Sequence, residues 1–327
     1  MNLYRYILWG LGVLVLGSGC SSESAIQQVL GVSAEAPVFL GCKAVSSQKI
    51  DFQFSLPVRV VSLYFDPPLE ATEVTEGAQV EVTVTQDLPG GSAVTVYMLV
   101  EDHQRNTLNL LIPFRTRNER FPSLMITELR TEYAKGKAEF VEVKSLSSGN
   151  LGALRLFIAS QGDTPVFEFP PVEVASGEYL VIHLRSLDAG LSNETGTDRG
   201  ASTGPEALVE ARDFWVPDTR KRLRKTDVVF FMDQDDQILD AVVLSEKAEP
   251  WAKVEVAEAA RQVSDQGAWL PSPEPHHAVP SKGTTVTRSI SRDEALADRN
   301  RAEDWYITAT SGVSPGKANT LKRYTPK

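Results

Sequence analysis

The sequence predicts an all-β protein of two antiparallel β-sandwich domains, the second of which carries loop insertions and a short helix. Apolar and polar residues alternate in short runs, as they do in strands that bury one face. Turns rich in Gly, Pro and Asp separate these runs at the regular spacing of sandwich domains. Hydrophobic residues make up 42% of the 327 residues and charged residues 23%, which are the proportions of a folded globular protein.

The amino terminus has the features of an export signal. Arg5 supplies a positive charge, and the apolar run from Tyr6 to Leu16 is too short to cross a hydrocarbon core of about 30 Å. Small residues from Gly17 to Gly19 then precede Cys20. This order resembles the signals of bacterial lipoproteins, including the looser signals of spirochaete-like lipoproteins, in which the cysteine is acylated and the segment before it is removed.

The resemblance implies a lipoprotein signal peptide at residues 1–19, a lipid on Cys20 and a lipidated tether over residues 20–35. The protein is then expected in a bacterial cell envelope, anchored by its lipid to a membrane, and the choice between outer and inner membrane stays open. Acyl chains supply this anchor because each buried CH₂ contributes about 0.8 kcal/mol. With Cys20 acylated, Cys42 has no disulfide partner, and its apolar neighbours predict a buried core residue.

Residues 36–118 are predicted to form the first sandwich. Apolar residues alternate with polar ones from Val80 to Val84 and from Val94 to Val100, which predicts two strands with one buried face. The segment resembles the bacterial Ig-like domains of S-layer and other surface proteins, which are spacers or adhesive modules. The matching pieces are the strand from Ile50 to Pro57, the turn from Leu88 to Gly91, and the stretch from Tyr97 to Asn106.

Residues 122–320 are predicted to form the second sandwich. A series of short motifs there resembles the lamin-tail domain, an Ig-like β-sandwich that also occurs in bacterial exported proteins and is used for protein, DNA or membrane-associated binding. The tryptophan that typically follows the Phe-Val-Glu strand is missing, and Leu154 is expected to fill its place in the core. In order, the motifs are Ile126-x-Glu128, Glu139–Glu142, Gly177–Ile182, the hairpin leading to Asp240–Val242, Asp304–Trp305 and Ser314–Asn319.

Two insertions enlarge this domain, near residues 186–226 and 245–282. The second insertion contains apolar residues at helical spacing, which predicts a short amphipathic helix from Val254 to Val263 that covers one end of the sandwich. Several prolines between Pro271 and Pro280 then favour an extended connection.

The first insertion holds the candidate binding residues. A dense basic cluster stands out against the net charge of −10, and such a cluster can bind phosphate or carboxylate groups of lipids, nucleic acids or cell-wall polymers. A solvated loop whose charge is balanced by nearby acids such as Glu206, Glu210 and Asp213 is the favoured interpretation. Phe214 and Trp215 are either a stacking surface beside it or core residues that hold the loop. The cluster consists of Arg220, Lys221, Arg222, Arg224 and Lys225.

The sequence contains no pattern typical of an activated nucleophile, a phosphate-binding loop or a zinc site. Asp233, Asp235 and Asp236 resemble the start of a calcium loop, but the glycine and the distal glutamate of such loops are missing, so a hairpin turn is predicted instead. We therefore expect no catalytic residue, no metal and no cofactor. A net acidic chain is also an unlikely nucleic-acid partner.

The predicted function is that of a membrane-anchored envelope lipoprotein, which acts as a non-catalytic binding or scaffolding module for an unidentified protein or envelope polymer. Two alternatives stay open. One is a hydrolase or nuclease-associated protein with an unrecognised site in the insertions. The other is polyanion or nucleic-acid binding through Arg220 to Lys225.

Overall fold

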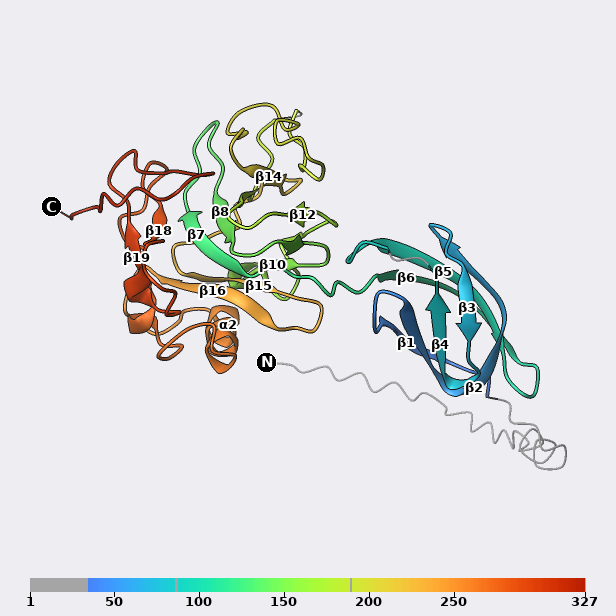
Figure 1. Ribbon diagram of the computed structural model, residues 1–327. Helices are drawn as coiled ribbons and strands as arrows, with labels where there is room; N and C mark the ends of the chain where they lie inside the picture. Colours follow the sequence, from blue (N-terminus) through green and yellow to red (C-terminus); the bar gives the residue numbers. More distant parts are fainter. Residues whose placement is uncertain (1–34, 86–87, 189, 327) are drawn as a thin grey trace, which may run out of the picture.

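The computed structural model describes residues 35–85, 88–188 and 190–326. This part of the protein is mostly β, with several sheets and one short α-helix, and Figure 1 shows the strands divided between two bodies. The predicted signal peptide, Cys20 and nearly all of the tether lie outside the described residues. Within the described ranges, no helix is long and apolar enough to cross a membrane.

The first domain is built around one long strand, β2 (Lys49–Asp66). The first half of β2 pairs antiparallel with β1 and β4, and its second half pairs with β5. Val80, Val82 and Val84 point into the core, as their alternation predicted. The other strands are β1 (Phe39–Ala44), β3 (Ala71–Val74), β4 (Gly77–Val84), β5 (Ala93–Glu101) and β6 (Thr107–Arg115).

The second domain has two main sheets that share one core. The first runs in the order β14 (Arg212–Trp215), β13 (Tyr179–His183), β8 (Phe140–Ser145), β7 (Leu124–Arg130), β18 (Ile290–Arg292) and β19 (Trp305–Ile307). The second runs in the order β11 (Phe167–Glu168), β10 (Arg155–Ile158), β15 (Asp227–Met232), β16 (Ile238–Ser245) and β17 (Val279–Pro280). A small pair, β9 (Gly149–Asn150) and β12 (Glu173–Val174), completes the strands of the domain.

The predicted helix is confirmed as α2 (Val254–Asp265). Its buried residues are the four whose spacing predicted it, namely Val256, Ala259, Ala260 and Val263. The helix packs against β15, β16 and the 3₁₀ turn η1 (Ala159–Gln161). Leu154 is fully buried in the same core, as expected from the missing tryptophan. Two further 3₁₀ turns are η2 (Pro275–His277) and η3 (Ala302–Asp304).

Two strand pairs are parallel, which the purely antiparallel prediction missed. β14 pairs parallel with β13, and β17 pairs parallel with β16. Each pair is connected by one of the two insertions, and a parallel pair requires such a long crossover. The insertion near residues 186–226 is therefore not simply a loop, because it adds an edge strand to the sheet.

Cys42 packs against the core of the first domain but is half-buried rather than fully enclosed. Burial is the main reason that the pKa of its thiol rises to about 12, and the charge of Asp51 adds to the shift. The thiol is therefore protonated at neutral pH and a poor nucleophile.

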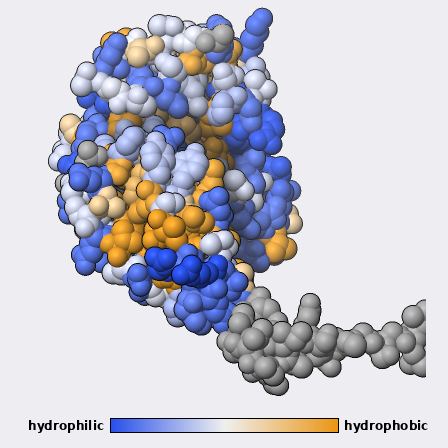
Figure 2. Space-filling model, turned by 90° about the vertical axis from the view of Figure 1, so that its right-hand side faces the viewer, coloured by the Kyte–Doolittle hydropathy of each residue, from blue (hydrophilic) through white to orange (hydrophobic). Residues whose placement is uncertain are grey.

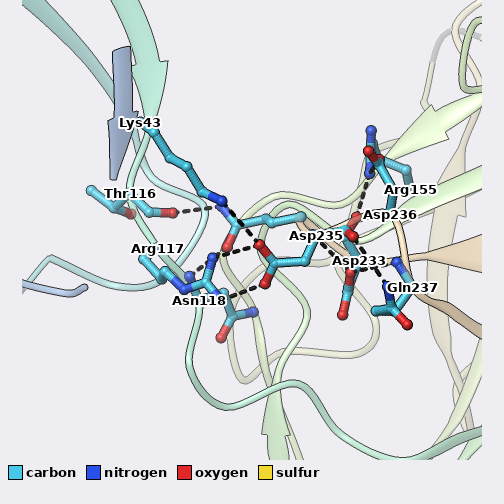
Figure 3. Close-up of polar contacts among 10 residues, drawn as sticks. Lys43, Thr116, Arg117, Asn118, Arg155, Asp233, Asp235, Asp236 and Gln237 are labelled. Carbon is cyan, nitrogen blue, oxygen red and sulfur yellow. Dashed lines mark hydrogen bonds and ion pairs between the residues drawn. The ribbon is translucent and has the colours of Figure 1, made fainter. Parts of the chain in front are cut away.

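A salt-bridged contact joins the two domains, as Figure 3 shows. The hairpin between β15 and β16 carries Asp235, whose carboxylate accepts a hydrogen bond from Nη1 of Arg117 at 2.9 Å. Lys43 of β1 approaches the same carboxylate at 3.4 Å. The hydrogen bond from Arg117 is the main reason that the pKa of Asp235 falls to about 2. The hairpin of one domain is thus held by cations from the other domain and from the connecting segment.

Hydrogen bonds between a side chain and the backbone also connect the two domains at this joint. Gln234 donates from Nε2 to the carbonyl of Thr116 at 2.9 Å and accepts from the backbone N–H of Asn118 at 2.7 Å. Beside them, a Cβ atom added to Gly152 would lie 1.8 Å from the carbonyl oxygen of Gly90. The two backbones therefore approach so closely that no side chain fits between them.

The hairpin turn predicted at Asp233 is confirmed. The Oδ1 atom of Asp233 accepts hydrogen bonds from the backbone N–H groups of Asp235 at 2.8 Å and Gln237 at 3.0 Å. Asp236 has a positive φ of 60° and pairs with Arg155 at 2.8 Å. The three carboxylates therefore bind N–H groups and cations of the turn and the joint (Figure 3).

Candidate functional site

A pocket of about 620 Å³ lies in the second domain, beside the open end of the β15–β16 pair. Its wall contains five cationic side chains that come from three stretches of the chain. These residues are Lys221, Arg224, Lys225, Lys247 and Lys253. We call this feature the cationic pocket.

The antiparallel pairing of β15 and β16 brings these stretches together. Asp227 at the start of β15 lies opposite Leu244 near the end of β16. Residues before β15 therefore lie beside residues after β16, which places Arg224 near Lys247. The chain then enters α2, whose N-cap residue is Lys253.

Asp227 fixes the first of the three stretches. Its carboxylate accepts from the backbone N–H of Arg224 at 3.2 Å, and from the backbone N–H and hydroxyl of Ser160 at 2.9 and 2.6 Å. Burial outweighs these hydrogen bonds and raises the pKa of Asp227 to about 6. The backbone that presents Arg224 is therefore held to the core of the domain.

Acids near the pocket compensate part of its positive charge, because Glu246 and Glu249 line it and Glu255 pairs with Lys253 at 3.0 Å. Lys221, Lys225 and Lys247 approach carboxylates at 3.3–3.9 Å, which is longer than a charge-assisted hydrogen bond, and such exposed pairs contribute little. Among the described residues, Arg224 has no ion-pair partner. The acids concerned are Glu132, Glu246 and Glu249.

One wall of the pocket is apolar and fixed. Trp251 packs against the core, and its indole N–H donates to the carbonyl of Pro273 at 2.9 Å. Val256 of the first turn of α2 adds to this wall. The Lys253 side chain makes no capping hydrogen bond and pairs with Glu255 at 3.0 Å, while the helix dipole adds partial positive charge at this end. The lining thus offers a ligand both cations and an aromatic ring.

The structure brings three of the five predicted basic residues to the pocket, namely Lys221, Arg224 and Lys225. Arg220 points to solvent and pairs with Asp218 at 3.0 Å. Arg222 is buried, and it donates to the carbonyl of Leu184 at 2.9 Å. The expectation of a ligand contact is therefore wrong for Arg222, because its guanidinium is used inside the fold.

Of the two interpretations of Phe214 and Trp215, the structure agrees with core residues that hold the loop and not with a stacking surface. Phe214 is fully buried and packs edge-on against Phe169. Trp215 is 5% exposed and stacks on His183 with ring centroids 3.7 Å apart. Both residues belong to β14, where they bind the first insertion to the core. The pocket lining instead includes Lys247, Trp251 and Lys253. No sequence pattern identified these three residues as candidates.

A second polar cluster is buried beneath the C-terminal segment. Glu128 on β7 and Glu142 on β8 lie opposite each other. Glu128 accepts from the backbone N–H of Ser314 at 3.1 Å, and Glu142 accepts from that of Gly316 at 2.5 Å. Burial raises the pKa of both carboxyls, and the charge of Glu128 adds to the shift of Glu142. These contacts fasten the Ser314–Asn319 segment over the sheet, so the cluster serves the fold.

No group of three or more His, Cys, Asp or Glu side chains in the described ranges is arranged to hold a metal ion.

Comparison with known proteins gives one family, one curated relative and one solved structure. A family model described as "protein second domain" matches residues 122–307. An uncharacterized protein of Treponema pallidum (strain Nichols) is 30% identical over 216 residues, which cover 60% of this chain and 54% of that protein. The chain thus spans about half the length of this relative. The crystal structure of the N-terminal part of the bacterial S-layer protein SbsC aligns with 13% identity and a TM-score of 0.26, covering 68% of this chain and 46% of that one.

Proposed function

The chain belongs to the family described as "protein second domain", and from this premise we propose that it is a lipid-anchored envelope protein that binds an anionic ligand without catalysis. The cationic pocket supports this proposal more than any other feature. Five cationic and two acidic side chains line it in a protein whose net charge is −10. This local excess of positive charge favours a ligand that carries phosphate or carboxylate groups.

The two halves of the pocket favour different parts of such a ligand. Lys side chains bind phosphate as compact point charges, whereas the planar guanidinium of Arg224 can form two parallel hydrogen bonds with one anionic group. The ring of Trp251 offers an apolar surface to the part of the ligand that carries no charge. We therefore propose an anionic envelope polymer or a phosphorylated small molecule as the ligand class.

We also propose that the first domain is of the bacterial Ig-like type and the second of the lamin-tail type. For the first domain, support comes from its antiparallel strands around one core. For the second domain, support comes from two sheets that share a core. It also comes from the contacts of Glu142, which lies opposite Glu128 and accepts a hydrogen bond from the backbone N–H of Gly316. These residues lie far apart in the sequence, in three of the motifs that resemble lamin-tail domains.

Removal of three cations from the pocket is expected to abolish most anion binding. Sodium polyphosphate is the probe, titrated calorimetrically into the full chain with Cys20→Ser to keep the protein off membranes. The variant Arg224→Ser/Lys225→Ser/Lys247→Ser is expected to bind at least tenfold more weakly. The slope of log K against log salt concentration is expected to decrease in magnitude by about 2–3, one for each lost contact.

Arg220→Ser/Lys322→Ser is the control, since both residues are exposed and lie outside the pocket lining. Its affinity and salt dependence are expected to equal those of the parent chain. Equal losses in the control and the pocket variant would show that binding follows overall charge instead of this site. No detectable binding by the parent chain would contradict the proposed ligand class.

The Cys20→Ser substitution is expected to move the protein from the membrane fraction to the soluble fraction of its bacterial host. The thiol is the acceptor of the proposed lipid, and serine removes it while leaving the rest of the signal unchanged. Metabolic labelling with radioactive palmitate provides the measurement, with Cys42→Ser as the matched control that keeps both label and membrane association. A Cys20→Ser protein that remains in the membrane fraction would contradict the proposed anchor.

A further inference from the structure

The outward face of the first domain carries an apolar row that crosses three strands. Tyr64 of β2 is paired in register with Tyr97 of β5, which is paired with Leu111 of β6. Their exposed fractions are 55%, 42% and 63%, and nearby Val61 is 46% exposed. Figure 2 shows apolar side chains gathered on the side of the molecule where this domain lies. We call Val61, Tyr64, Tyr97 and Leu111 the apolar face.

The apolar face is not explained by the packing of the domain. Alternate residues of these strands, such as Val96 and Met98, already fill the core, and the opposite face of such a sheet is normally polar. The two tyrosine rings lie with their centroids 5.7 Å apart. A contiguous exposed group of large apolar side chains of this kind marks a surface that contacts another body.

The position of the chain entry argues for a lipid bilayer as that body. β1 is the first strand of the domain, and Val38 and Leu40 at its start are 57% and 63% exposed. β1 also contacts β6, the strand that carries Leu111. Fifteen peptide units connect Cys20 to Glu35, and fully extended they span at most about 50 Å. A lipid on Cys20 would therefore keep this end of the domain within about 50 Å of the membrane.

We propose that the apolar face lies against the interfacial region of the bilayer that carries the anchor. The proposal rests on the lipid anchor of the proposed function. Tyrosine suits this position because its ring enters the apolar boundary while its hydroxyl stays among head groups and water. Confinement by the tether raises the effective concentration of the face at the membrane, so a patch of modest affinity is sufficient for docking. The residues that line the cationic pocket belong to the second domain.

The test places a fluorophore on the full, lipidated protein in vesicles of phosphatidylcholine and phosphatidylglycerol. Leu111→Cys carries the label in a Cys42→Ser background, and lipids brominated near the head group serve as quenchers. Strong quenching is expected at position 111. Asp163→Cys in the exposed turn after η1 is the matched control position and is expected to show none. Adding Tyr64→Ser/Tyr97→Ser is expected to remove the quenching at position 111 while the protein still sediments with the vesicles.

The outcomes distinguish a failure of the docking proposal from a failure of the proposed lipid anchor. An unquenched label on protein that sediments with the vesicles would overturn the docking proposal and leave the anchor intact. Protein that does not sediment with the vesicles would overturn the anchor and the docking together. Energy transfer between labels at position 111 of different molecules, without quenching by lipid, would identify the apolar face as a contact between copies and overturn the membrane assignment.

Discussion

Replacement of Glu142 by alanine is expected to lower the melting temperature of the second domain by about 10 °C. The carboxylate accepts from the backbone N–H of Gly316 at 2.5 Å and from the hydroxyl of Thr127 at 2.6 Å. Alanine leaves both buried donors without an acceptor, at a cost of about 1–3 kcal/mol each. For a domain of this size, 1 kcal/mol corresponds to about 2–4 °C. Differential scanning calorimetry measures the shift.

Glutamine at the same position is the matched control. Burial raises the pKa of Glu142 well above its usual value, and glutamine keeps the shape of this carboxyl and an oxygen that accepts a hydrogen bond. The Glu142→Gln protein is therefore expected to melt within about 3 °C of the parent. Equal melting temperatures for the alanine variant and the parent would contradict a structural role for the hydrogen bond to the C-terminal segment.

The Glu142→Gln substitution is expected to change the pH dependence of the free energy of unfolding. Burial raises the pKa of Glu128 and Glu142, and it raises the pKa of Asp240 to about 7 and that of Asp227 to about 6. In the unfolded chain these carboxyls lose their protons near pH 4, so above that pH the folded state binds more protons than the unfolded one. The free energy of unfolding then falls as the pH rises from about 4 to about 7, and it levels off above the folded pKa values. The urea midpoint is expected to be lower at pH 7.5 than at pH 5, with a smaller difference in Glu142→Gln.

Gly152→Ala is expected to open the joint between the two domains. The new Cβ atom would lie 1.8 Å from the carbonyl oxygen of Gly90 and 2.9 Å from Oδ1 of Asn150. In the first of these contacts the Cβ atom is fixed by its own backbone and meets a backbone oxygen, so no side-chain rotation relieves it. Separation of the domains avoids the overlap at the cost of the ion pairs of Asp235 with Arg117 and Lys43. Small-angle X-ray scattering is expected to show a larger radius of gyration, and calorimetry to show two transitions in place of one.

Gly196→Ala is the control for this substitution, because a Cβ atom there meets nothing within 4 Å. It is expected to change neither the radius of gyration nor the number of transitions. An unchanged scattering profile in Gly152→Ala would mean that the joint accommodates the methyl group by local movement. The close approach of the two glycines would then not determine the domain arrangement.

The local structure of the chain could be predicted wherever one face of a helix or strand is buried and the other face is exposed to solvent. The valines of β4 and the apolar residues of α2 follow this rule, and their periods of two and 3.6 residues identified them. β7 shows where the rule stops. All of its residues are buried, including Glu128, because the C-terminal segment covers the face that would otherwise meet water. Burial on two faces removes the alternation, and the motif Ile126-x-Glu128 within the strand identified it instead.

The pairing of distant segments could not be predicted from the pattern. The dipeptide Phe214–Trp215 looks the same in a loop and in an edge strand, and its place in β14 depends on a crossover from β13. The cationic pocket has the same origin. Lys221, Arg224 and Lys225 are neighbours in the sequence, but Lys247, Trp251 and Lys253 reach them through the register of β15 and β16. Arg222 lies among the predicted residues and faces inward, because a run of charges does not reveal which way each side chain points.

The long strand of the first domain has a consequence for how that domain acquires its structure. β2 pairs with β1 and β4 through its first half and with β5 through its second half. Both halves of the sheet therefore depend on this one strand. Residues from β1 to β6 must then order together as one cooperative unit, with much of the pairing between positions far apart in the chain. Such non-local pairing slows folding. A newly synthesised molecule would therefore remain without this domain until β6 has left the ribosome.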